Sequence, residues 1–156
     1  MPNVPDSIAE FLRGHRIAVA GVSRDPKQTA NLIFRKFKDA GYDVVPVNPK
    51  TNTAEGVTCY PDLASIPGQI DGVFAVTPPV TGGELIAQCA ARGVPRIWFH
   101  SSVFGQGSVP HDAVKEATRL GVKCIEGACP MMFVAPVDVG HRCFRWWLGV
   151  RHKLPA

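Results

Sequence analysis

The sequence predicts an α/β fold: a Rossmann-like, doubly wound sheet of about five parallel strands with helices on both faces, built as a single domain. Short apolar runs alternate along the chain with segments in which apolar residues recur at helical spacing. The runs are apolar throughout, which is typical of parallel strands that are covered on both faces. A chain of 156 residues also has the length of one domain.

The expected elements follow one another in the order β-α-β-(α)-β-α-β-α-β, after a short N-terminal helix that stops at Gly14. The strands are expected over residues 17–22, 42–47, 70–77, 94–99 and 122–126. The helices are expected over about 28–40, from a cap at Thr81 onward, and after Pro110. A short extended piece at 57–60 precedes a further helix start at 61–63.

Helical spacing also predicts which side chains face the sheet. In the helix over 28–40 these are Ala30, Ile33, Phe34 and Phe37. In the helix after Pro110 they are Ala113, Val114, Ala117 and Leu120. Residues 1–132 are thus predicted to form the domain, and residues 133–156 a C-terminal extension of unknown role.

Composition indicates which class of ligand and which cellular compartment to expect. The formal net charge of +4 is scattered, so a phosphate-bearing small molecule is expected as partner, and nucleic acid is not. No stretch approaches the roughly 18 apolar residues of a membrane span, and the N-terminus lacks the features of a signal peptide. The five cysteines form no Cys-x-x-Cys pair, which is typical of thiols in a reducing compartment, so we expect a cytoplasmic protein.

The segments after the strands are where a ligand is expected, because doubly wound sheets bind ligands beyond the carboxyl ends of their strands. These segments are residues 21–24, 48–50, 77–79, 100–102 and 127–130. The sequence contains no Walker A motif, His-Glu-x-x-His, nucleophile elbow or zinc-ligand spacing. No catalytic or metal-binding residue is therefore predicted.

The first of these segments is Gly21-Val-Ser-Arg24. Glycine permits a tight turn and a close approach of the backbone to a ligand. The N–H groups of residues 22–24 and the dipole of the following helix suit an anion. Ser23 can donate to a phosphate oxygen, and Arg24 adds positive charge. The loop lacks the Gly-x-Gly-x-x-Gly of a dinucleotide site, which disfavours NAD; an ordinary strand-to-helix loop is the alternative.

The second segment is Asn48-Pro49-Lys50. Proteins that bind NAD usually carry an acidic residue here for the ribose diol. Asn48 can bond a hydroxyl without repelling a phosphate, and Lys50 can pair with one. A phosphorylated ribose fits this segment better than a bare diol, which leaves NADP and coenzyme A (CoA) as candidates. A simple turn is the alternative.

The third segment, Thr77-Pro78-Pro79, presents a rigid apolar surface beside a hydroxyl. A nucleotide or a pantetheine arm can lie across such a surface, although two prolines also simply end a strand. His100 is a candidate ligand or base, and Cys129 a candidate thiol near the ligand. A structural role is the commoner one for both residue types.

Together these segments resemble the family of small CoA-binding proteins with a Rossmann-type fold, which are similar to the N-terminal CoA-binding domain of the succinyl-CoA synthetase α subunit. The resemblance covers about residues 8–132. It rests on residues 17–24 and 42–50, Thr77-Pro78-Pro79, the strand with Trp98, and Glu126 with Cys129-Pro130. The sequence lacks the later domain with the synthetase's phosphorylated histidine, so ligase activity is not implied.

The resemblance implies a role for each of the first three segments. The first loop would hold the CoA phosphates, the end of the second strand would meet the adenosine part, and the end of the third strand would line the cofactor. The residues implicated are Gly21, Val22, Ser23, Arg24, Asn48, Pro49, Lys50, Thr77, Pro78 and Pro79.

The leading hypothesis is a protein that binds CoA or acyl-CoA through its nucleotide and phosphate groups, without catalysis of its own. One alternative is an NADP-dependent reductase, with Asn48 and Lys50 at the 2′-phosphate. Another is a non-catalytic regulatory subunit of a larger complex. The tail around residues 143–147 would then contact a second copy or a protein partner. A further idea is a mixed disulfide between Cys129 and CoA.

Overall fold

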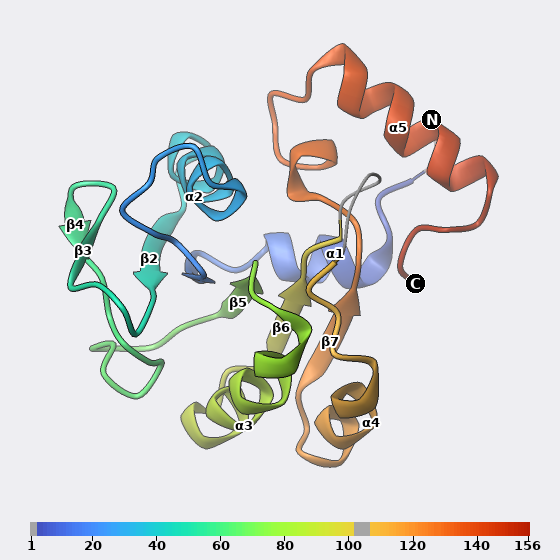
Figure 1. The fold of residues 1–156 in the computed structure, drawn as a ribbon. Coiled ribbons are helices and arrows are strands. Elements are labelled where there is room, and N and C mark those ends of the chain that lie inside the picture. The colour runs from blue at the N-terminus through green and yellow to red at the C-terminus, as the bar shows by residue number, and fades with distance from the viewer. Residues whose placement is uncertain (1–2, 102–106) are drawn as a thin grey trace.

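The computed structural model describes residues 3–101 and 107–156; Ser102, at the end of the fourth predicted segment, lies outside them. Five parallel strands form one sheet in the order β2-β1-β5-β6-β7 (Figure 1). They are β1 (Arg16–Ala20), β2 (Asp43–Val47), β5 (Gly72–Ala75), β6 (Arg96–Phe99) and β7 (Lys123–Glu126). The predicted fold class is confirmed.

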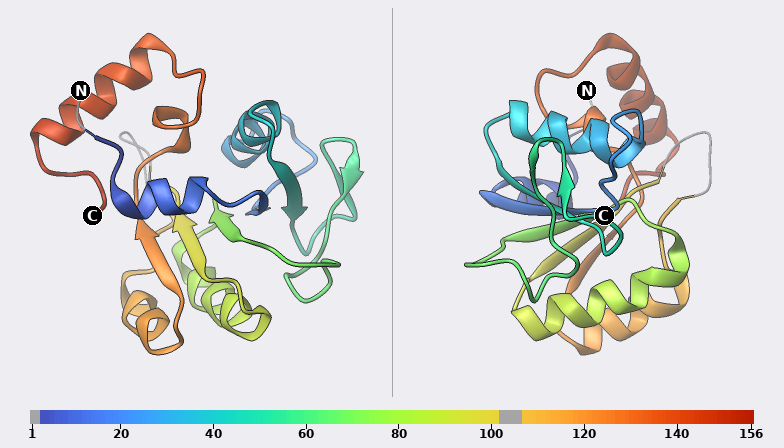
Figure 2. Two further views of the ribbon diagram at one scale, coloured as in Figure 1. Left: turned by 180° about the vertical axis from the view of Figure 1, so that it is seen from behind. Right: turned by 60° about the vertical axis from the view of Figure 1, so that its left-hand side comes forward.

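Helices cover both faces of the sheet (Figures 1 and 2). On one face lie α1 (Asp6–Leu12), α2 (Thr29–Asp39), the 3-10 turn η2 (Pro130–Met132) and α5 (Val139–Val150). On the other lie α3 (Gly82–Arg92) and α4 (His111–Arg119). Two separate apolar clusters result, because successive residues of each strand point to opposite faces.

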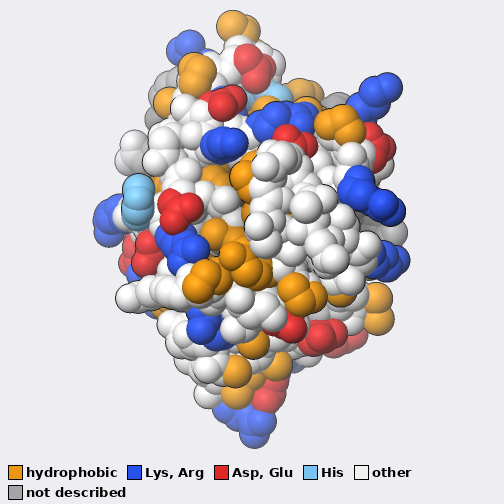
Figure 3. Space-filling view, turned by 90° about the vertical axis from the view of Figure 1, so that its left-hand side faces the viewer, with side chains coloured by type: hydrophobic (Ala, Val, Ile, Leu, Met, Phe, Trp, Pro, Cys, Tyr) orange, Lys and Arg blue, Asp and Glu red, His pale blue; other side chains and the backbone are white. Residues whose placement is uncertain are grey.

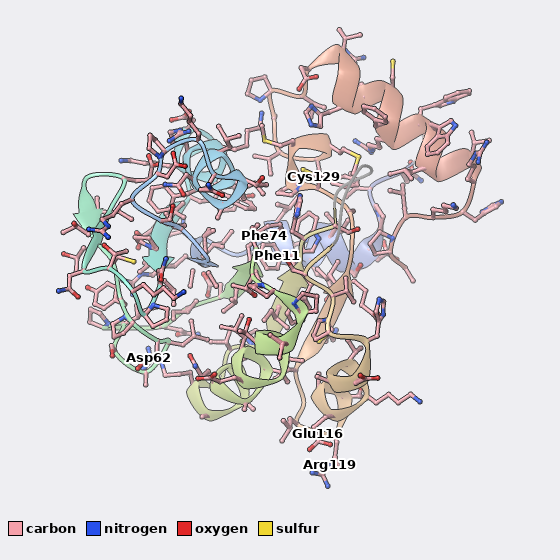
Figure 4. All side chains as sticks on the ribbon, in the orientation of Figure 1. Phe11, Asp62, Phe74, Glu116, Arg119 and Cys129 are labelled. Atoms are coloured by element: carbon pink, nitrogen blue, oxygen red, sulfur yellow. The ribbon has the colours of Figure 1, made fainter. Side chains whose placement is uncertain are left out.

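The cluster under α1 and α2 is largely aromatic. Phe11 of α1 and Phe74 of β5, both labelled in Figure 4, pack edge-on to Trp98 with ring centroids 5.4 and 5.1 Å away. Trp98 is fully buried, and its indole N–H donates to the carbonyl of Gly127, 2.7 Å away. This bond ties β6 to the segment that follows β7.

Several local expectations were wrong. Residues 61–63 start no helix: Asp62 instead accepts hydrogen bonds from the N–H and hydroxyl of Ser65, which closes a turn. Thr81 precedes α3, but its hydroxyl donates to the carbonyl of Pro78 at 2.9 Å and caps no N–H of the helix. Leu120 is 41% exposed, because α4 has ended at Arg119 and the chain has left the helical repeat.

A small hairpin lies between β2 and β5. Its strands are β3 (Thr53–Ala54) and β4 (Val57–Thr58), which pair antiparallel. The extended piece expected at 57–60 is the second of them. Figure 3 looks onto this side of the molecule, and its Lys and Arg side chains are interspersed with Asp and Glu rather than gathered in one patch.

The sheet is fastened at the end where its strands begin. The carboxylate of Asp71, just before β5, accepts hydrogen bonds from the backbone N–H groups of His15 and Arg16, at 2.8 and 2.9 Å. The N–H of Arg16 and then that of His15 hold the pKa of Asp71 below its usual range. Arg16 also pairs with Asp43 of β2 through a 2.9 Å contact.

Residues 133–156 return to the domain. Phe133 and Val134 are buried, and Phe133 packs 6.1 Å from Trp98, so the apolar cluster extends beyond residue 132. Helix α5 is capped by Asp138, which accepts from the N–H of His141, and it rests on the cluster through Phe144 and Leu148. Across residues 3–101 and 107–156, no helix is long and apolar enough to cross a membrane.

The outward face of α5 is also apolar. Val139, Trp146 and Val150 are 73%, 55% and 59% exposed, and Cys143 is exposed between them. These four residues follow one another at intervals of four, three and four, so they form one stripe along the helix. We call them the outer stripe of α5.

Candidate functional site

Three of the predicted segments meet at the centre of the sheet. Strand β1 lies between β2 and β5, so the turn that follows β1 lies between the ends of its two neighbours. The side-chain amide of Asn48 donates to the carbonyl of Val22 at 3.0 Å. A Cβ on Gly21 would lie 3.5 Å from the methyl group of Thr77. The chain order also switches at β1, where this fold class binds its ligands.

Gly21 allows the first turn to form. Its φ is +100°, and its N–H donates to the carbonyl of Val47 at 2.9 Å. A Cβ at this position would lie 2.2 Å from the carbonyl oxygen of Val76, well inside van der Waals contact. Only glycine fits, both because of the backbone conformation and because the β5 backbone approaches so closely.

The loop after Gly21 is held by Asn31, a residue that the sequence analysis missed. Asn31 is 1% exposed; its amide oxygen accepts from the N–H of Ser23, and its amide nitrogen donates to the carbonyl of Ser23. The same nitrogen donates to Glu55 at 2.7 Å. Asn31 lies three residues before Phe34, on the buried face of α2, and a polar residue there was the available signal.

Glu55 joins this loop to the β3–β4 hairpin. Its carboxylate also accepts from the guanidinium of Arg35 at 2.7 Å, and Arg35 donates in turn to the carbonyl of Pro26. Glu55 has a φ of +51°, which orients its side chain within the hairpin turn. No pattern in the sequence connects these residues, because the contacts join segments that are far apart in the chain.

The first segment therefore offers only part of the donor set that was expected. Of the N–H groups of residues 22–24, only that of Ser23 has an acceptor among the described residues, namely Asn31. The Ser23 hydroxyl bonds with the backbone of Asp25. Val22 is buried, whereas Arg24 is exposed. The N–H and the guanidinium of Arg24 are therefore the groups of this loop that an anion can reach most directly.

Asn48 closes the second segment on itself. Its amide oxygen accepts from the N–H of Lys50 at 2.9 Å while its amide nitrogen bonds Val22. The side chain thus joins two of the predicted segments. Pro49 and Lys50 are exposed beside it. The structure leaves their role toward a ligand as a prediction.

The third segment contains a buried hydroxyl. Within the described ranges, the Thr77 hydroxyl is buried and has no hydrogen-bond partner, whereas the Thr77 N–H donates to the Ser108 hydroxyl at 3.1 Å. A buried polar atom without a partner costs free energy unless a further group, such as a ligand, bonds it. Pro78 is exposed, and Pro79 begins the 3-10 turn η1 (Pro79–Thr81).

His100 and Cys129 have surroundings that suppress their charged forms. His100 is 6% exposed and its ring lies edge-on to Phe74, and burial lowers its pKa. Cys129 lies at the base of η2 (Figure 4), and burial raises the pKa of its thiol. In the described part of the chain, no group of three or more His, Cys, Asp or Glu side chains could hold a metal ion.

A large pocket lies beside these segments. Its volume is about 1070 Å³, and it extends from η1 across the ends of β6 and β7 to α4 and α5. Of the ten residues that the resemblance implicated, Pro79 is the one in its lining among the described residues. Ser101, Gly127 and Ala128 of the lining come from the fourth and fifth predicted segments. The remaining lining residues are Val80, Gly83, Ser101, Gly107, Val109, Pro110, His111, Asp112, Ala113, Glu126, Gly127, Ala128, Met132, Leu148 and Lys153.

The sequence of residues 15–135 matches the family described as the CoA binding domain. The match covers most of the chain, and the fold has the strand order and the glycine turn of a nucleotide-binding sheet. The chain therefore belongs to the CoA binding domain family, a class that the resemblance noted in the sequence had indicated.

Two relatives show what the chain is similar to. The uncharacterized protein YneT of Bacillus subtilis is 42% identical over 125 residues, which cover 78% of this chain and 87% of that protein. The α subunit of ADP-forming acetate–CoA ligase II of Pyrococcus furiosus is 31% identical over 97 residues, which are 62% of this chain. The matched part is only 21% of that subunit.

A solved structure has the same fold. A hypothetical protein from Pyrococcus horikoshii OT3 superposes with a TM-score of 0.70 at 30% sequence identity. The superposition covers 80% of this chain and 84% of that one. The chain is therefore similar both to proteins of its own size and to one part of a much larger ligase subunit.

Proposed function

We propose that this protein binds CoA across the ends of β2, β1 and β5. The observation that carries the proposal is the buried Thr77 hydroxyl, which has no hydrogen-bond partner among residues 3–101 and 107–156. It lies next to the Gly21 turn, in a chain of the CoA binding domain family. A ligand that accepts from or donates to this hydroxyl would remove the cost of burying it.

The residues present fit the groups of CoA. The N–H and the guanidinium of Arg24 suit the pyrophosphate. Buried Val22, whose carbonyl accepts from Asn48, would hold the Gly21 turn beneath them. Lys50 is exposed at the neighbouring segment and suits the phosphate on the ribose. Residues 77–79 would contact the pantetheine arm through the Thr77 hydroxyl and the proline rings. Ser23, Asn48 and Pro49 would shape the loops that hold these groups, in line with their hydrogen bonds in the structure.

The test is thermal unfolding of the purified protein with CoA, acetyl-CoA, NADP, NAD or no ligand. CoA at 100 times its dissociation constant should add about 2.7 kcal/mol to the free energy of unfolding. Stabilisation by NADP and not by CoA would contradict the proposal and favour the reductase, because NADP also carries a phosphorylated ribose that suits Lys50.

A single variant tests the hydroxyl. Thr77→Val removes the oxygen and keeps the shape, so CoA should bind about tenfold more weakly, the value of one hydrogen bond of about 1.4 kcal/mol. The unliganded protein should lose no stability, because the hydroxyl has no partner to lose within the described residues. Equal CoA affinity in the two proteins, measured by calorimetry, would argue against the contact.

We propose binding without chemistry by this chain alone. His100 is buried among core residues, which disfavours a role in proton transfer to a ligand. The raised pKa of Cys129 disfavours a mixed disulfide with CoA, because the thiolate is the reactive form. Intact-mass measurement after incubation with oxidised CoA tests this: no adduct is expected. We also propose a cytoplasmic location, a compartment in which thiols stay reduced.

We further propose that the outer stripe of α5 pairs with the same helix of a second copy. Spacing of four, three and four is that of helix-pairing seams, and a twofold pair would cover the stripe of both chains. Sedimentation equilibrium should show a concentration-dependent dimer. Trp146→Ser should make the protein monomeric and leave CoA binding unchanged; a wild-type protein that stays monomeric would contradict the pairing.

A further inference from the structure

The pocket of about 1070 Å³ begins where the proposed CoA site ends. Pro79 belongs to both, and the pocket continues from it over Ser101, after β6, and Gly127, after β7. Neighbouring strands lie about 4.8 Å apart, so the end of β7 lies on the order of 14 Å from the β1 turn, three strand spacings away. The pocket therefore lies along the edge that the distal end of a CoA bound at β1 and β2 would reach.

The walls of this pocket are mainly apolar. Val80 from η1, Val109 before α4, Met132 from η2 and Leu148 from α5 contribute side chains from four separate elements. Val80 is 88% exposed, so an apolar side chain stands uncovered at the pocket. A bound apolar group would remove this surface from water, which is the main source of affinity for such ligands.

The charged groups of the pocket do not favour an anion. His111 and Glu126 pair at 3.7 Å, and both side chains are largely exposed. Asp112 adds a further carboxylate, and Lys153 adds an exposed ammonium group. Acidic and basic groups thus occur together around an apolar interior. An uncharged hydrocarbon group fits this arrangement better than a second carboxylate or a phosphate.

The far wall comes from a part of the chain that the family match does not cover. The match ends at residue 135, whereas Leu148 and Lys153 belong to α5 and the residues after it. Helix α5 is fixed in place by the packing of Phe144 and Leu148 on the apolar cluster. The pocket therefore combines an edge of the common fold with a wall that α5 supplies.

We propose that this pocket receives the uncharged acyl group of an acyl-CoA and that α5 sets which acyl chains fit. The proposal rests on the proposed binding of CoA and names the class of ligand: thioesters with an apolar acyl chain. Free CoA would occupy only the site at the ends of β2, β1 and β5, whereas an acyl-CoA would also cover Val80, Val109 and Leu148.

Calorimetric titration with CoA, acetyl-CoA and hexanoyl-CoA tests the proposal. Each methylene that enters the pocket should tighten binding by up to about fourfold, so hexanoyl-CoA should bind clearly more tightly than CoA. Leu148→Trp should fill the pocket and abolish the advantage of hexanoyl-CoA while leaving the affinity for CoA unchanged. The matched control is Val150→Trp, the same change on the outward face of the same helix, which should retain the advantage.

Val80→Ser provides a second variant that does not depend on core packing, because Val80 is exposed. It should reduce the advantage of hexanoyl-CoA and leave the melting temperature unchanged. Equal affinity of the wild-type protein for CoA and hexanoyl-CoA would overturn the acyl pocket and leave CoA binding intact. An advantage that survives in both Leu148→Trp and Val80→Ser would place the acyl group elsewhere. A lack of binding by any CoA species would instead overturn the proposed function.

Discussion

At the scale of single residues, the site depends on two residues whose side chains meet opposite requirements. Gly21 must have no side chain, because the Val76 carbonyl oxygen occupies the space a Cβ would need. Asn31 must have a particular one, because its amide bonds both the N–H and the carbonyl of Ser23. The sequence predicted the first, from a glycine directly after an apolar strand. It did not predict the second, whose partner Glu55 lies on the hairpin.

Gly21→Ala should lower the free energy of unfolding by about 2–4 kcal/mol, from backbone strain and from the clash with Val76. Gly41→Ala is the matched control. Gly41 has a similar φ of +95°, but a Cβ there would meet nothing within 4 Å. It should cost only the strain, about 1–2 kcal/mol. Urea denaturation measures both; equal losses would mean that the β5 backbone yields to the added methyl group.

Asn31→Ala should destabilise the protein by about 2 kcal/mol, because it leaves partly buried backbone groups of Ser23 without their partners. CoA binding should weaken as well, since the loop at 22–24 loses its anchor. Lys38→Ala, at an exposed position of the same helix, should change stability by less than about 0.5 kcal/mol. A loss in Asn31→Ala no larger than in this control would show that the loop holds its shape without the amide.

At the scale of elements, periodicity predicted the strands and the main helices, because their faces are buried by neighbours on both sides of the sheet. Periodicity failed where the chain departs from the regular spacing of a helix. Leu120 continues the spacing of α4, yet it follows the last helical residue and is exposed. Residues 61–63 begin with helix-favouring signals, yet Asp62 finds its partners within a turn. Hydrogen bonds to nearby backbone groups decide such cases, and composition does not reveal them.

We expect the packing of α5 on the domain to depend on the residues of its inward face alone. Leu148→Ala should lower the free energy of unfolding by about 1–2 kcal/mol, because Leu148 packs on the apolar cluster but is only partly buried. Val150→Ala, on the outer stripe, should cost less than about 0.5 kcal/mol in dilute protein. Chemical denaturation followed by tryptophan fluorescence measures both. A larger effect at Val150 would mean that the outer stripe is covered under the conditions used.

At the scale of the whole molecule, stability should fall as the solution is acidified, and two of the groups responsible act at different pH. Burial lowers the pKa of His100 below its usual 6.5, so the unfolded chain takes up a proton first. The contribution of this residue is complete above about pH 6.5 and is lost as the pH falls toward its folded pKa. The pKa of Asp71 is lowered too, so its contribution is present above about pH 3.8 and is lost below it.

Urea denaturation across pH separates these two contributions. His100→Gln should show a smaller decline between pH 7 and pH 5.5 than the wild-type protein, whatever its stability at pH 7. Asp71→Asn should be less stable at pH 7 and should show a smaller decline below about pH 4. Slopes identical to wild type in both variants would assign the acid sensitivity to other groups.

The overall architecture was predictable because each strand and helix repeats one simple pattern. The site was predictable only in outline. The three segments at the centre of the sheet follow from strand order, but the large pocket requires α5, whose position depends on the contact of Phe133 with Trp98 and on the packing of Leu148. Contacts between distant parts of the chain of this kind leave no periodic trace in the sequence.

The fastening of β1 and β5 by Asp71 has a practical consequence for anyone who wishes to engineer the protein. It holds the strands together where they begin, whereas Gly21, Asn48 and Thr77 lie where the strands end. The contacts that join the strands and the residues proposed to meet the ligand thus lie at opposite ends of the sheet. Stabilising substitutions can be introduced around His15 and Asp71, and ligand preference can be redesigned at the opposite end, with little interference between the two sets of changes.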